Sequence, residues 1–149
     1  MLSGSENDVQ AGLQTILDRL APGRFWCTSR KNSGASMIRK PVDLEIRSKG
    51  GPAVIAVEVA NVNTTQLVGE TCRLYFDTCF LKILVLGDRN VPRDGKEQCE
   101  LLLARLYGQD RIENTPARVV WFHDDAAAAQ ALAELLLLNS VPAVGLATG

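Results

Sequence analysis

Three carboxylate side chains lie in two short segments whose other residues are mostly hydrophobic. Asp43 and Glu45 fall within residues 41–46, and Glu58 falls within residues 54–60. In an extended strand alternate side chains share a face, so Asp43 and Glu45 would lie on one face of the first segment. If the two segments pair, Asp43 or Glu45 lies near Glu58. Carboxylates held together repel one another unless a cation or a basic group lies among them, so the pattern indicates a divalent-metal site.

Basic residues surround these carboxylates, although the whole chain has a formal net charge of −1. Between Arg24 and Lys49 there are seven basic residues and two acidic ones, a local excess of +5. The seven are Arg24, Arg30, Lys31, Arg39, Lys40, Arg47 and Lys49. A basic surround suits a polyanionic substrate held near a metal. The alternative is a solvated fringe of lysine and arginine along strand edges.

The composition indicates one globular domain covering residues 1–149. Hydrophobic residues make up 46% of the chain and charged residues 22%, which argues against both a disordered and a membrane protein. Residues 1–10 lack the basic start and apolar stretch of a signal peptide, so we expect a cytoplasmic protein. The four cysteines have no CxxC spacing, so we expect reduced thiols, most of them buried.

Hydrophobic periodicity and turn residues predict the elements that would position the carboxylates. The predicted helices cover about 9–20 (after capping residues 5–8), 64–80 with Thr64 or Thr65 as the cap, 94–107 and 124–138; the predicted strands cover 25–30, 38–46, 53–60, 82–86 and 118–122. The order αβββαβαβα implies an α/β fold with a mixed central sheet flanked by helices, antiparallel in its first part and parallel in its second. We expect the core to span about 5–123 and residues 139–149 to form a flexible tail.

With this order in place, the acidic segments resemble the PD-(D/E)xK, restriction-endonuclease-like nuclease superfamily. Members of that family have an αβββαβ core, with an Asp at the start of the second strand, a Glu or Asp in the third strand and a Lys two residues later. Asp43 and Glu58 match the acidic positions, whereas Ala60 stands where the lysine would be. The resemblance covers about residues 5–90.

The resemblance implies a Mg²⁺ ion held by Asp43, Glu58 and the backbone of Val59, and no small-molecule cofactor. The metal would polarise a DNA phosphodiester for attack by water. Because Ala60 cannot orient or activate that water, a basic group from another element would have to do so. The candidates are Lys49, Lys40, Arg47 and Arg73, with Lys49 and Arg73 taken as catalytic residues.

Other polar residues near the motif have two readings each. On the helix after the third strand, Gln66, Glu70 and Arg73 either face the site or form a solvated helix face. Glu6, on the first helix, is the family's further acidic candidate. Asp43 and Glu58 could instead be partners of Arg47 and Arg73 in structural ion pairs. The same reading is favoured for Glu45, and the only histidine, His123, is favoured as a strand-end residue.

Two functions from different classes follow from these residues. The first is a metal-dependent nuclease that acts on DNA, a Mg²⁺-dependent endonuclease if it is active. The second is a non-catalytic module on the same fold that binds nucleic acid or assembles with proteins, as the missing lysine and the net acidic charge suggest. We expect a homodimer in either case, because leucines in excess of one helix face, at Leu101, Leu102, Leu103, Leu106 and 135–138, could supply an interface.

Overall fold

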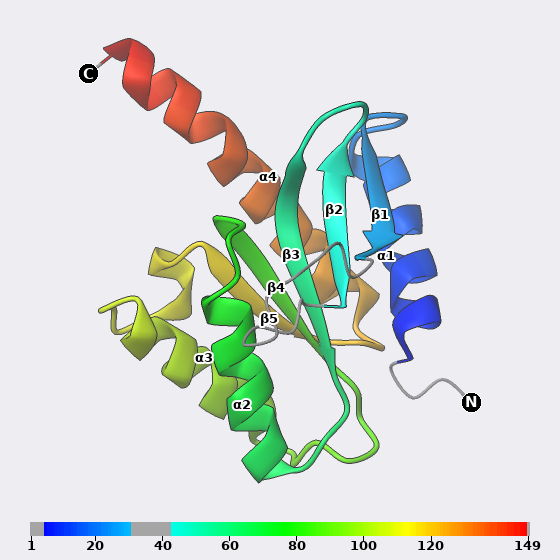
Figure 1. Cartoon of the computed structure of the whole chain (residues 1–149), viewed down its shortest axis with the longest axis vertical. Coiled ribbons are helices and arrows are strands. Elements are labelled where there is room, and N and C mark those ends of the chain that lie inside the picture. Colours follow the sequence, from blue (N-terminus) through cyan, green and yellow to red (C-terminus); the bar gives the residue numbers. More distant parts are fainter. Residues whose placement is uncertain (1–4, 31–42, 149) are drawn as a thin grey trace.

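The computed structural model describes residues 5–30 and 43–148, and of residues 140–148 it describes the backbone alone. The helices are α1 (Glu6–Leu20), α2 (Thr64–Tyr75), α3 (Gly95–Leu106) and α4 (Asp125–Thr148), with a 3-10 turn η1 (Ile112–Asn114). The strands are β1 (Phe25–Ser29), β2 (Leu44–Ser48), β3 (Ala53–Ala60), β4 (Leu81–Leu86) and β5 (Ala117–Trp121). This is the element order that the sequence predicts (Figure 1).

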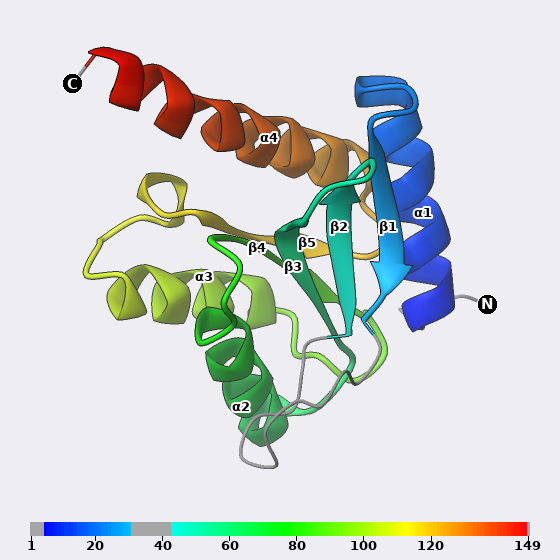
Figure 2. The ribbon, with the colours of Figure 1, turned by 45° about the horizontal axis from the view of Figure 1, so that its top comes forward.

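The strands form one mixed sheet in the order β1-β2-β3-β4-β5. The pairs β1–β2 and β2–β3 are antiparallel, and the pairs β3–β4 and β4–β5 are parallel. The parallel pairs need crossover connections, and α2 and α3 supply them. The predicted α/β class, with a mixed sheet flanked by helices, is therefore confirmed (Figures 1 and 2).

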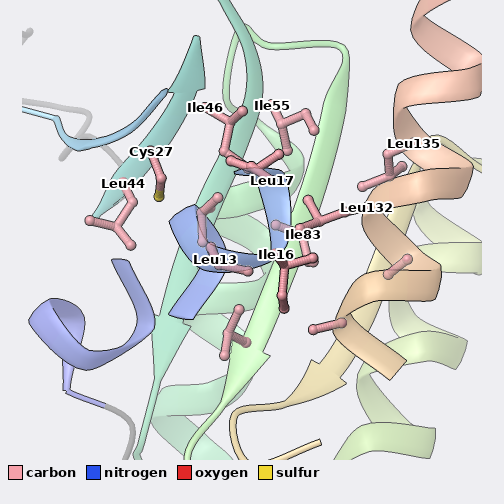
Figure 3. Packing of buried hydrophobic residues seen from close by; sticks show 14 of the residues in the cluster. Leu13, Ile16, Leu17, Cys27, Leu44, Ile46, Ile55, Ile83, Leu132 and Leu135 are labelled. Carbon is pink, nitrogen blue, oxygen red and sulfur yellow. The ribbon is translucent and has the colours of Figure 1, made fainter. Parts of the chain in front are cut away.

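Helices cover both faces of the sheet, and each face has its own hydrophobic core. Helices α1 and α4 pack on one face, where Leu13, Leu17 and Leu132 meet strand residues such as Ile46 and Ile55 (Figure 3). Helices α2 and α3 pack on the other face. The residues of that second core include Ala56, Ala60, Leu67, Leu74, Leu84, Leu86 and Leu103. The alternation of side chains along β3 thus assigns Ile55 and Val57 to the first face, and Ala56 and Ala60 to the second.

The boundaries of α2 differ from the prediction at both ends. Asn63, and not Thr64 or Thr65, caps the helix, since its side-chain oxygen accepts the backbone N–H of Gln66. The helix ends at Tyr75 instead of about Phe80. After it, Asp77 accepts the backbone N–H of Cys79, so a side-chain hydrogen bond replaces the helical pattern there.

At the other end of the chain, α4 continues through Thr148, where we expected a helix ending at Leu138 and then a tail. The expectation relied on Pro142 as a helix breaker. One proline costs a helix about 3 kcal/mol, and residues 126–138, which precede it, are rich in Ala and Leu and have high helix propensity.

The leucines expected to form a dimer surface divide between core and surface. Leu103 and Leu135 are buried, whereas Leu101 and Leu137 are exposed. The four cysteines are free thiols as expected, two of them buried and two half-buried. The part of the second predicted strand before Asp43 lies outside the described residues. Among the helices of the described chain, none combines the length and apolar character that crossing a bilayer requires.

Candidate active site

The register of the β2–β3 hairpin brings Asp43 and Glu58 together. Leu44, the first residue of β2, pairs with Val57 of β3. Asp43, just before Leu44, therefore lies opposite Glu58, just after Val57. The backbone N–H of Asp43 donates to Oε1 of Glu58 at 3.2 Å, and the N–H of Val59 donates to Oδ2 of Asp43 at 2.9 Å. The convergence expected from the sequence is therefore present, with Asp43 as the partner of Glu58.

Glu58 is fully buried, with 0% of its surface exposed. Burial, followed by the charge of Asp43 and a hydrogen bond with its side chain, raises the pKa of the Glu58 carboxyl to about 9. The positive charge of Arg73 opposes this shift without reversing it. Near neutral pH the carboxyl of Glu58 is therefore held in its protonated form, and a cation placed beside it would favour ionisation.

Arg73 is the basic group that reaches this pair. It comes from the last turn of α2, and its Nη1 lies 3.0 Å from Oε2 of Glu58. The Arg73 side chain is about one-third exposed, so it contacts the buried carboxyl and also reaches solvent. Of the two residues predicted to replace the missing lysine, the structure brings Arg73 to the carboxylates.

Lys49 is not brought to them. Arg47 pairs with Ala53, so Lys49 lies in the turn beyond this pair, at the end of the hairpin opposite to Asp43 and Glu58. Glu58 is five steps along β3 from Ala53, which is about 17 Å at the usual rise per residue. Because a lysine side chain cannot span that distance, the structure does not bring Lys49 to the carboxylates, contrary to the sequence-based expectation. Lys40, the other lysine candidate, lies outside the described residues.

Glu70 lies one helical turn before Arg73 on α2 and also belongs to this site. Its negative charge contributes to the raised pKa of Glu58, and its Oε2 atom is buried. Gln66, one turn further back, is exposed. The reading of this helix face as solvated thus fits Gln66 but is wrong for Glu70 and Arg73.

Glu45 lies on the same face of the sheet but in a different network. Its Oε1 is 3.5 Å from Nε of Arg30, and its Oε2 is 3.7 Å from Nε of Arg47. Arg30 also pairs with Asp77 and donates to the sulfur of Cys79 at 3.5 Å. Glu45 therefore forms structural ion pairs, as favoured from the sequence, and Arg47 is one of its partners.

Ala60 is buried in the second hydrophobic core, against α2 and α3. The next residue, Asn61, has another role: its side-chain oxygen accepts the N–H of Asn90, and its backbone oxygen accepts the side-chain amide of Asn90, each at 3.1 Å. Asn61 therefore ties the end of β3 to the loop after β4.

The two remaining candidates lie apart from the carboxylates. Glu6 begins α1, and α1 packs on the face of the sheet opposite to α2. His123 follows β5, where its Nδ1 lies 3.6 Å from Oδ2 of Asp88 and its ring stacks on Trp121. This is the strand-end position expected for the histidine.

The sequence did not identify Lys82 as a polar residue of this face. It lies on β4 opposite Ala56, and its Nζ donates to the hydroxyl of Tyr107 at 3.1 Å and lies over the rings of Tyr75 and Tyr107. Burial lowers the pKa of the Lys82 amine. A lysine inside the apolar run of β4 was the available signal, but its amine binds aromatic residues of α2 and α3 rather than the carboxylates.

The donor atoms around Asp43 are those that Mg²⁺ prefers. The backbone N–H of Val59 points to Asp43, and in a strand the carbonyl of the same residue points to the same side. Two carboxyl groups and one carbonyl oxygen are hard oxygen donors suited to Mg²⁺. Within residues 5–30 and 43–148, no three side chains of His, Cys, Asp or Glu are grouped to bind a metal, so the candidate set includes the backbone oxygen.

Comparison with known proteins adds no family assignment: no known family model matches this sequence, and no curated protein is significantly similar to it.

Proposed function

We propose that this protein is a metal-dependent nuclease-like protein that acts on DNA phosphodiesters, with Arg73 in place of the lysine of the motif. One observation carries the proposal: a guanidinium from α2 lies 3.0 Å from Glu58 at the point where Asp43 and Glu58 converge. The αβββαβ order around this point and the mixed sheet support the restriction-endonuclease-like fold that the motif implies.

In this proposal Asp43, Glu58 and the carbonyl of Val59 would hold one Mg²⁺ ion. The ion supplies Lewis-acid stabilisation of the charge that develops on a phosphate oxygen. Glu58 must lose its proton to bind the ion, because its pKa is raised to about 9 without one. Binding of the metal is therefore expected to release protons near neutral pH.

Arg73 would bind and orient the phosphate. Its side chain presents several N–H donors in one plane and stays charged at all relevant pH values, so it can contact Glu58 and a phosphate oxygen at once. For the same reason it cannot accept a proton from water, as a lysine with a lowered pKa could. We therefore expect slow hydrolysis compared with an enzyme that has the lysine.

The second candidate function is a non-catalytic nucleic-acid-binding or protein-assembly module on the same fold. It is favoured by the contacts of the carboxyl groups: Oε1 of Glu58, Oε2 of Glu58 and Oδ2 of Asp43 each have a protein donor. Such a closed arrangement can stabilise a fold without any metal. In that case the basic surround would still bind a polyanion.

Incubation of the purified protein with plasmid, single-stranded and branched DNA in Mg²⁺ or Mn²⁺ distinguishes the two functions. Cleavage should be lost in Asp43→Asn and Glu58→Gln, and reduced by at least about tenfold in Arg73→Ala. Glu97→Gln is the matched control, since Glu97 is an exposed carboxylate in the first turn of α3. Cleavage that persists in both Asp43→Asn and Glu58→Gln would remove the pair from the mechanism, and binding without cleavage would favour the module.

A further inference from the structure

The half of the sheet formed by β1 and β2 presents a polar surface on the same face as the candidate active site. Cys27, Leu44 and Ile46 belong to the core under α1 and α4, so their neighbours along each strand point to the opposite face. Those neighbours include Trp26, Glu45 and Arg47. Glu58 lies on that face too, because it contacts Arg73 of α2. Figure 1 shows α2 and α3 over the β4–β5 side of this face, beside β2 and β1.

Trp26 places an exposed indole ring on this polar surface. It is 44% exposed, although tryptophan is among the residues that gain most from burial. Its direct cross-strand partner is Arg47, whose side chain is 49% exposed. An aromatic ring and a guanidinium are therefore held side by side on a rigid pair of strands.

Further cations lie at the same end of the hairpin. The backbone N–H of Lys49 donates to the backbone oxygen of Arg24 at 2.8 Å, which joins the β2–β3 turn to the start of β1. Both Arg24 and Lys49 are exposed. Arg24 lies two residues before Trp26, and Lys49 lies two residues after Arg47. Three cations thus lie at the same end of the hairpin as one exposed indole.

We propose that Trp26, with Arg24, Arg47 and Lys49, is a stacking subsite for unpaired nucleotides of the strand that the acidic pair acts on. This inference rests on the proposed nucleic-acid function and specifies its substrate as single-stranded or locally unpaired. An exposed aromatic ring binds the face of a base, and that face is accessible only when the base is unstacked from its neighbours. Cations beside the ring bind the phosphates that flank the base. The subsite also gives Lys49 a role that its distance from Glu58 allows.

The spacing between the subsite and the acidic pair sets the length of strand that can occupy both. Trp26 pairs with Arg47 and Arg47 pairs with Ala53, about 17 Å along β3 from Glu58. The two strand spacings of about 4.8 Å between β1 and β3 bring the separation to about 20 Å. At 3.4 Å per nucleotide of a stacked strand this separation corresponds to at most about six nucleotides, and to fewer when the bases are unstacked.

The test is equilibrium binding of a 12-nucleotide single strand and of the matching duplex, in EDTA so that no hydrolysis occurs. Trp26→Ala should weaken single-strand binding by roughly 5- to 150-fold, the range for loss of one base–aromatic stack, and duplex binding by less than about twofold. Arg47→Ala should lower the slope of log affinity against log salt by about 1. Phe80→Ala and Arg111→Ala are matched controls, because Phe80 is 65% exposed and the side chain of Arg111 is 75% exposed.

A spectroscopic measurement separates stacking from a general loss of charge. In a Trp121→Phe background Trp26 is the only tryptophan, and its fluorescence should be quenched by the single strand and not by the duplex. No quenching, equal losses on both nucleic acids, or a loss as large in Phe80→Ala would overturn the subsite. Those results concern Trp26 in the absence of metal, so they can be told apart from a failure of Asp43 and Glu58 to support cleavage.

Discussion

Nη1 of Arg73 on α2 donates a hydrogen bond to Oε2 of Glu58 on β3 at 3.0 Å, and of the two side chains only that of the arginine has access to solvent. The glutamate also accepts a hydrogen bond from the backbone N–H of Asp43. Because this cation lies on a neighbouring helix, it couples the position of that helix to the ionisation of the buried carboxyl. The pair is therefore a structural contact between α2 and β3, and in the proposed function it would also position Glu58 for a metal.

Arg73→Ala should destabilise the fold, because it leaves a buried oxygen of Glu58 without its donor. At pH 7, where the raised pKa keeps Glu58 protonated, we expect a loss of about 1–3 kcal/mol in the free energy of unfolding. Urea denaturation measures it. Arg105→Ala, which removes an exposed pair with Asp110, is the control and should cost less than about 0.5 kcal/mol. Equal effects of the two substitutions would show that the buried pair has no special role.

Stability should fall as pH rises through the titration of Glu58. The folded-state pKa of about 9 lies above the ordinary value of 4.5, so the folded protein binds a proton more tightly than the unfolded chain does. The contribution of Glu58 is fully present below about pH 4.5 and is lost as pH rises towards 9. Glu58→Gln should remove this part of the pH dependence, and the melting temperature measured without divalent metal from pH 5 to 9 tests it.

Glu134→Gln provides a control of opposite sign. Hydrogen bonds from Arg118 and Gln130 lower the pKa of Glu134, so its contribution is present above the ordinary value and is lost as pH falls through the lowered pKa. This variant should flatten the acid side of the melting curve and leave the range from pH 6 to 9 unchanged. The assignment of the alkaline slope to Glu58 fails if Glu58→Gln and the wild type have parallel curves above pH 6.

The sequence predicted the elements and the acidic pair because both depend on local patterns. Alternating residues define β2 and β3, and a tight turn between them fixes a register in which Asp43 meets Glu58. The basic partner was predicted only as one of several candidates, because its choice depends on which helix residues face the sheet. Arg73 reaches the site through the packing of Leu67 and Leu74 of α2 against β3, a tertiary contact that spacing along the chain does not specify.

The positions of Lys49 and Lys82 also depend on tertiary structure. Lys49 is near Asp43 in sequence, but it lies in the β2–β3 turn, at the end of the hairpin opposite to Asp43. Lys82 lies in an apolar strand, and only the structure shows that two tyrosines from different helices receive its amine. Strand register thus determines which residues lie near the acidic pair more than proximity in sequence or polarity does.

Gly87→Ala should destabilise the loop that borders the site. A Cβ atom at Gly87 would lie 2.6 Å from Cγ of Asn61, whose side chain holds the loop through Asn90. We expect a loss of about 1–3 kcal/mol, the usual cost of overpacking. Gly69→Ala, in the middle of α2 with no atom within 4 Å of the new Cβ, is the matched control and should stabilise the protein by about 0.5–1 kcal/mol. If Gly87→Ala is as stable as the wild type, Asn61 is free to move and does not fix the loop.

Mg²⁺ should stabilise the protein more at high pH than at low pH, because metal and proton compete for Glu58. At pH 6 the proton must be displaced, whereas near pH 9 about half of the carboxyl is already ionised, so the apparent metal affinity should rise across this range. The rise in melting temperature at a fixed Mg²⁺ concentration measures this affinity by mass action. The increase should be absent in Asp43→Asn and present in Glu97→Gln. An equal rise at pH 6 and pH 9 in the wild type would indicate that any metal binds away from Glu58, which would leave the buried Glu58–Arg73 pair with a structural role alone.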